Sequence, residues 1–89
     1  MEQPYSPRTA LSFLSGLPGN PNIGRDTDGV GATWYRRRGF IREPIYTLSI
    51  NAGGYLTVFN HLLDRITDEG VDWDSRYEVA DNILRDMGY

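Results

Sequence analysis

The chain has 89 residues, of which 39% are hydrophobic and 24% charged, a formal net charge of −3 and no cysteine. This length fits one domain and leaves few residues for a deep active-site cleft, while the charge content is too low for a disordered polyelectrolyte. Without cysteine there is neither a disulfide framework nor a thiolate metal site. We therefore expect one domain over residues 1–89, and the absence of cysteine fits a reducing cytoplasm.

A membrane or secretory location is not expected from the sequence. No apolar run approaches the roughly 20 residues that a bilayer-spanning helix needs. The first seven residues, Met1 to Pro7, have neither the basic start nor the apolar stretch of a secretory signal. The prediction is a cytoplasmic protein with no membrane partner.

The first third of the chain, residues 1–31, is predicted to hold a short helix and a long loop. Ser6 followed by Pro7 is typical of an N-cap and a first helical position, which predicts a helix over residues 7–15. Residues 16–31 are rich in glycine, proline and asparagine, a composition that favours turns. The sequence leaves open whether this loop is ordered.

Residues 32–50 are predicted to form a β-hairpin. Side chains alternate from Ala32 to Arg38 and again from Ile45 to Ile50, and many of them are β-branched or aromatic. We expect two antiparallel strands joined through Gly39–Pro44.

The segment 55–68 fits two structures. Tyr55–Phe59 has strand propensity and could close a second hairpin. Its apolar residues also recur with the period of a helix, and this period continues into Leu62 and Ile66. We favour an amphipathic helix over residues 55–68, with Gly70 as its end.

A last helix is predicted to follow. Asp72 or Asp74 could cap it, or Ser75 and Glu78 could form a capping box that starts it later. The two helices would make an antiparallel αα-hairpin over residues 55–87. The predicted fold class is α+β in the order α-β-β-α-α, with a two- or three-stranded antiparallel sheet packed against the C-terminal helical hairpin.

Positive charge is concentrated in the first half of the chain. Residues 1–42 carry six arginines and three acidic residues, whereas residues 43–89 carry nine acidic residues and three arginines. Arginine beside aromatic rings suits anionic or planar partners, through paired hydrogen bonds and stacking. The first candidate binding site is therefore the basic cluster, which comprises Tyr35, Arg36, Arg37, Arg38 and Arg42. The alternative is that Trp34 belongs to the core and that alternate arginines pair with the carboxylates of the predicted helices.

The second candidate site is an acidic cluster, which comprises Asp68, Glu69, Asp72 and Asp74. Carboxylates presented where phosphates would lie could engage the basic groove of a nucleic-acid-handling protein. Because arginines are interspersed along this half of the chain, an ordinary solvated helix surface is the alternative.

The sequence contains no convincing motif for a metal site, a cofactor site or a catalytic site. Asp26–Gly29 lacks the third acidic ligand and the distal glutamate of a calcium loop, so a turn is favoured. His61 is the only histidine, and the sequence pairs it with neither a nucleophile nor an orienting carboxylate. We predict no cofactor, no metal and no enzymatic activity.

The function predicted is that of a small non-enzymatic protein-binding module. Its class resembles the small accessory proteins by which bacterial viruses (phages) inhibit a larger protein or complex, including one that handles nucleic acid. The alternative is a nucleic-acid-binding module that uses the Arg36–Arg38 run on phosphates. A homodimer remains a further alternative for the assembly.

Overall fold

The computed structural model describes residues 4–89, so residues 1–3 of the predicted 1–31 segment and 1–89 domain lie outside the described residues. Within residues 4–89, two helices and five strands form an α+β fold. In chain order the elements are α1 (Pro7–Ser15), β1 (Asn22–Asp26), β2 (Gly29–Arg38), β3 (Ile41–Asn51), β4 (Leu56–Asn60), β5 (Arg65–Val71), the short 3₁₀ turn η1 (Trp73–Ser75) and α2 (Arg76–Asp86).

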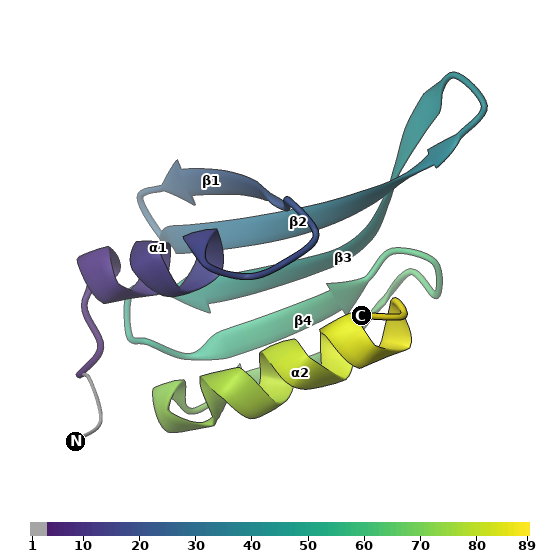
Figure 1. The fold of residues 1–89 in the computed structure, drawn as a ribbon. Helices are drawn as coiled ribbons and strands as arrows, with labels where there is room; N and C mark the ends of the chain where they lie inside the picture. The colour runs from purple at the N-terminus through teal and green to yellow at the C-terminus, as the bar shows by residue number, and fades with distance from the viewer. Residues whose placement is uncertain (1–3) are drawn as a thin grey trace.

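The five strands make one antiparallel sheet in which neighbours in sequence are neighbours in space, in the order β1-β2-β3-β4-β5. Both helices cover the same face of this sheet, α1 over its first strands and α2 along β4 (Figure 1). The opposite face has no helix among the described residues.

The predicted fold class is wrong in its second half. The segment 55–68 forms β4 and part of β5 rather than a helix, so the order is α-β-β-β-β-β-α and there is no C-terminal helical hairpin over residues 55–87. Burial along β4 has a period of two, because Leu56, Val58 and Asn60 are buried and the residues between them are half-buried. The chain turns after Asn60, and the left-handed backbone of Asp64 (φ 53°) is incompatible with a continuous helix.

Elements with strong local signals are confirmed. The helix over 7–15 begins with the expected cap: Ser6 Oγ accepts a hydrogen bond from Thr9 N (3.1 Å), and Thr9 Oγ1 accepts one from Ser6 N (2.8 Å). The predicted hairpin of residues 32–50 lies within β2 and β3, but the predicted connection through Gly39–Pro44 is too long, because only Gly39 and Phe40 join the strands and the other four residues belong to β3. The predicted loop over 16–31 is only partly a loop, because its residues also supply β1 and the start of β2.

The last helix begins later than an aspartate cap would place it. Asp72 precedes η1 and Ser75 precedes α2, but neither side chain makes a capping hydrogen bond. The alternative prediction, a later start at Ser75, is therefore right in position, but its capping box with Glu78 is not formed.

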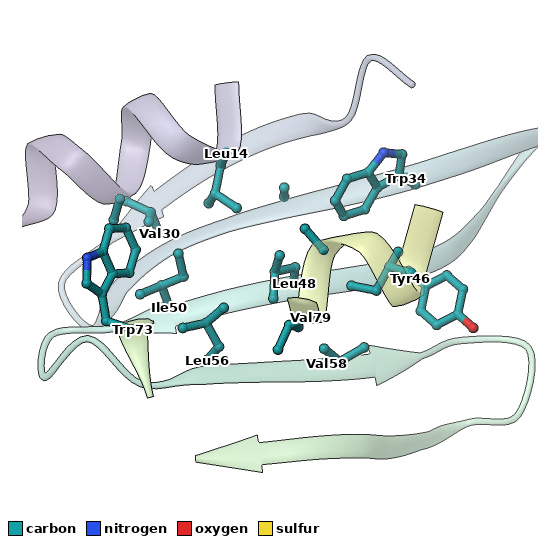
Figure 2. Close-up of a cluster of buried hydrophobic side chains, with 14 residues drawn as sticks. Leu14, Val30, Trp34, Tyr46, Leu48, Ile50, Leu56, Val58, Trp73 and Val79 are labelled. Atoms are coloured by element: carbon teal, nitrogen blue, oxygen red, sulfur yellow. The ribbon is translucent and has the colours of Figure 1, made fainter. Parts of the chain in front are cut away.

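The core lies between the helices and the covered face of the sheet (Figure 2). Its fully buried large side chains are Leu14, Trp34, Leu48, Ile50, Leu56 and Val58. Trp34 Nε1 donates a hydrogen bond to Pro18 O (2.9 Å), which ties the loop after α1 to the sheet. Trp34 is thus a core residue, which confirms this part of the alternative interpretation given for the basic cluster.

Within residues 4–89, no helix is long and apolar enough to cross a bilayer. The compartment in which the protein works stays a prediction.

Candidate functional site

The residues of the basic cluster lie on an arm that projects from the sheet. β1 pairs with β2 only as far as Thr33, and β4 pairs with β3 from Tyr46 onward. The remaining strand ends pair only with each other, so residues 35–44 form a two-stranded arm (Figure 1). The arm accounts for the elongated shape of the chain, which measures 43 × 24 × 22 Å.

The base and tip of the arm are shaped by local backbone features. At the base Trp34 pairs with Tyr46 but Tyr35 pairs with Pro44, so Ile45 is the extra residue of a β-bulge. A bulge increases the local twist and turns the strands away from the sheet. At the tip, two residues join the strands, and Gly39 has a φ of 64°. A positive φ at the first turn residue alone is the pattern of a type II′ hairpin turn, which favours glycine there.

The arm carries four arginines and a single carboxylate. Glu43 Oε2 lies 3.1 Å from Arg36 Nε and 3.9 Å from Arg38 Nη1. The Arg42 guanidinium lies 4.4 Å from the centroid of the Tyr35 ring, a cation–π contact. Arg37 and Arg42 face each other across the two strands. The arm therefore keeps a net positive charge, and its exposed ion pairs contribute little to stability.

Two large apolar side chains stand at the tip. Phe40 is fully exposed and Ile41 is 67% exposed. Neither is a member of the core cluster of residues 4–89 or packed against it. Exposed apolar side chains rimmed by charge are characteristic of surfaces that bind another molecule. Phe40 and Ile41 fall within the sequence run Trp34–Arg42 that contains the basic cluster, but neither they nor Glu43 was predicted as a binding residue. The glycine before Phe40 indicated a turn that would place them in solvent.

The acidic cluster is split and lies far from the arm. Asp68 and Glu69 belong to the edge strand β5, while Asp72 and Asp74 lie at the start of η1. All four are exposed. The prediction that they lie on a helical hairpin is wrong, because Asp68 and Glu69 belong to a strand. Charged side chains on such an edge strand discourage pairing with another sheet. η1 leads into the N-terminal end of α2, which is the end of this helix farther from the arm (Figure 1).

The uncovered face of the sheet is hollowed beside the arm. Gly24, Gly31 and Ser49 stand opposite one another on β1, β2 and β3, and their small size leaves a shallow depression of about 570 Å³. Tyr35 borders it toward the arm, and Asp28 is among the residues that line it. Its lining combines hydroxyl groups with one residue of each charge, Arg25 and Asp28, and does not by itself identify a ligand.

His61 acquires a partner in the structure that the sequence did not identify. Its Nε2 lies 2.7 Å from Thr47 Oγ1, which in turn lies 2.9 Å from Thr33 Oγ1. The edge of the Phe59 ring contacts the imidazole, with ring centroids 4.8 Å apart. Among the described residues no carboxylate is hydrogen-bonded to His61, so the pair lacks the orienting group of a catalytic triad.

The weak calcium-loop pattern forms a turn, as predicted. Asp26 ends β1 and Gly29 begins β2, and these two residues pair across the hairpin. Among the side chains that the structure describes, which do not include that of Asp26, no group of three or more histidine, aspartate or glutamate residues could hold a metal ion.

A polar cluster of two buried residues, Tyr46 and Asn60, and the exposed Asp86 anchors α2 beside the base of the arm. The Tyr46 hydroxyl donates a hydrogen bond to Asp86 Oδ2 and accepts one from Asn60 Nδ2 (3.2 Å). Burial, and then the neighbouring carboxylate, raises the pKa of Tyr46 to about 12. Because Tyr46 also pairs with Trp34, this cluster joins α2 to the residues from which the arm emerges.

No protein-family model matches the chain. Searches of curated proteins and of solved structures returned no match either.

Proposed function

We propose that the protein is a non-enzymatic protein-binding module and that the arm, residues 35–44, is its binding element. The observation that carries the proposal is the combination of a projecting basic hairpin with an apolar tip formed by Phe40 and Ile41. Protein interfaces have this organisation, with apolar and aromatic anchors at the centre and charged groups around them. The partner surface would be an apolar pocket with an acidic rim.

The apolar tip favours a protein partner over nucleic acid. Arginines alone would serve phosphates equally well, but Phe40 and Ile41 gain most from an apolar pocket that removes them from water. The net charge of −3 also opposes approach to a polyanion. The nucleic-acid alternative requires the tip to act as a wedge between bases, as in some minor-groove binders.

An inhibitory role is the finer part of the proposal. An arm that fills a pocket on a larger protein would exclude that pocket's own ligand. If the partner handles nucleic acid, the acidic cluster offers carboxylates at a second surface, distant from the arm. This division would let the basic arm and the acidic cluster contact different parts of one large complex.

The proposal is tested by affinity capture from a lysate of the native host, with and without nuclease. One variant replaces the three consecutive arginines Arg36, Arg37 and Arg38 by alanine. A second, Phe40→Ser with Ile41→Ser, removes the apolar tip at unchanged charge. We expect a discrete protein partner that survives nuclease and is lost in both variants.

A matched control distinguishes the effect of removing charge from the arm from the effect of lowering the positive charge of the chain as a whole. Replacing the exposed arginines Arg8, Arg65 and Arg85 by alanine changes the net charge equally but leaves the arm intact. This control should retain the partner. Recovery of nucleic acid alone, sensitive to nuclease and insensitive to the tip variant, would instead assign the protein to the nucleic-acid-binding class.

A further inference from the structure

We infer that the outer edge of β2 within the arm binds an extended acidic segment of the partner as an additional β-strand. This inference rests on the proposed function and specifies how the arm would engage its partner. It depends on three observations: an unpaired strand edge, a block on the opposite edge, and an arginine on the open edge, Arg37, that has no carboxylate partner within the described chain.

The pairing pattern shows that Tyr35 presents its backbone to the open edge. Asn51 N donates to Tyr55 O (3.0 Å), so the backbone groups of Asn51 face β4. Successive residues of a strand turn these groups to opposite sides, so Ile50 faces β2 and its partner Val30 faces β3. Every second residue of β2 after Val30 also faces β3. Tyr35 therefore directs its N–H and C=O groups outward.

The same alternation holds at the tip. Arg38 and Ile41 flank the two-residue turn and bond to each other, so Arg37 also faces outward. Among the described residues, β1 covers this side of β2 only as far as Thr33. Tyr35 and Arg37 together offer two donors and two acceptors spaced for an extended chain.

The loop before β1 leaves this edge open. Pro18 O accepts a hydrogen bond from Trp34 Nε1, so the loop packs against this core side chain. Gly19 and Asn20 have positive φ values of 91° and 52° and therefore do not continue the extended conformation of β1. Both residues contribute to a hollow of about 320 Å³ that Tyr35 and Arg37 also line. A strand added to β2 would therefore run on from β1, in the space that this hollow provides.

The other edge of the arm is blocked. By the same alternation Arg42 and Pro44 turn outward on β3, and Pro44 has no N–H to donate. Proline on an edge strand prevents continuous pairing. The arm is therefore competent to accept a strand on its β2 side only.

The side chains beside the open edge specify an acidic partner. Glu43 pairs with Arg36 and Arg38, whereas within residues 4–89 no carboxylate pairs with Arg37 or Arg42. In an added strand, every second side chain would share a face with Tyr35 and Arg37. A carboxylate beside Arg37 and an apolar side chain beside Tyr35 complement these residues.

The experiment measures binding of a synthetic fluorescent peptide, Glu-Val-Glu-Val-Asp-Val-Glu, to the full 89-residue chain. Fluorescence anisotropy compares the wild type with Arg37→Ala, which removes the charge, and Arg37→Pro, which also removes the outward N–H. We expect affinity to fall several-fold in the first variant and about tenfold further in the second. The same peptide with N-methylated backbone amides is the matched control, and it should not bind.

Amide hydrogen exchange of the wild type keeps the test independent of variant folding. Adding the unmodified peptide should slow exchange at Tyr35 and Arg37 and leave β5 unchanged. Equal affinity of the alanine and proline variants, or protection elsewhere, would overturn the strand-addition inference. Protection at both β2 and β5 that grows with protein concentration would identify a second copy of the chain as the occupant, and would also overturn it.

The two proposals fail in different ways. If no acidic peptide binds but the alanine variant of Arg36–Arg38 still loses its captured partner, strand addition is wrong and the protein-binding function stands. If capture is insensitive to every arm variant, the proposed function is wrong as well.

Discussion

Replacing Tyr46 by phenylalanine should remove part of the protein's sensitivity to alkaline pH. The pKa of Tyr46 rises from 10.0 to about 12 on folding, chiefly because the hydroxyl is buried and secondly because it donates to Asp86. The folded state therefore retains this proton at pH values where the unfolded chain has released it. The stabilisation is complete below pH 10 and is lost as the pH rises through 12.

The size of the effect follows from the two pKa values. Between pH 9 and pH 11 the free energy of unfolding of the wild type should fall by about 1.3 kcal/mol more than that of Tyr46→Phe. Urea unfolding followed by tryptophan fluorescence measures this, since a denaturant slope of about 1 kcal/mol/M converts it to a midpoint shift of about 1.3 M. Asp86→Asn should keep the part of the pH dependence that comes from burial and lose the part that comes from the hydrogen bond to Asp86 and from its charge. Parallel pH profiles for wild type and Tyr46→Phe would refute the reasoning.

Two further predictions concern the loop before β1 and the tip of the arm. Gly19→Ala should lower the free energy of unfolding by about 1–3 kcal/mol, because φ is 91° and a Cβ would lie 2.9 Å from the Trp34 ring; an unchanged urea midpoint would contradict this. Phe40→Ser with Ile41→Ser should leave the thermal midpoint unchanged to within about 3 °C, because neither side chain packs on the core. A larger loss, measured by calorimetry, would mean that the tip supports the fold rather than a partner.

Local sequence signals were sufficient for the elements that depend on neighbouring residues. The Ser6 cap and Pro7 mark the start of α1, and alternation marks most of β2 and β3. β1 was not predicted, because its residues have little strand propensity and its conformation depends on pairing with β2. Which strand pairs with β1 depends on residues outside the segment itself, and a local sequence pattern does not record this.

The error at residues 55–68 came from two periods that overlap. The apolar residues from Tyr55 to Ile66 match a helix, but Leu56 and Val58 also match the buried side of a strand. Tertiary pairing with β3 decided between them, since each residue of β4 has a partner there. The stretch therefore adopted the structure that completed the sheet, which local periodicity alone could not select.

The charged residues of the candidate site were identified from the sequence, but their position on a projecting arm was not predicted. Arg36, Arg37, Arg38 and Arg42 were identified from their run in the sequence. Their projection into solvent depends on where β1 and β4 stop pairing, which no motif records. The tip residues Phe40 and Ile41 become meaningful only once that projection is known.

The central claim is that the arm is the surface that meets the partner. Amide hydrogen exchange, measured by mass spectrometry on the chain alone and in complex with the captured partner, tests it most directly. The account predicts slowed exchange in peptides that cover residues 35–44, with little change in α2. Protection confined to β5, η1 or α2, with the arm exchanging as in the free chain, would contradict it.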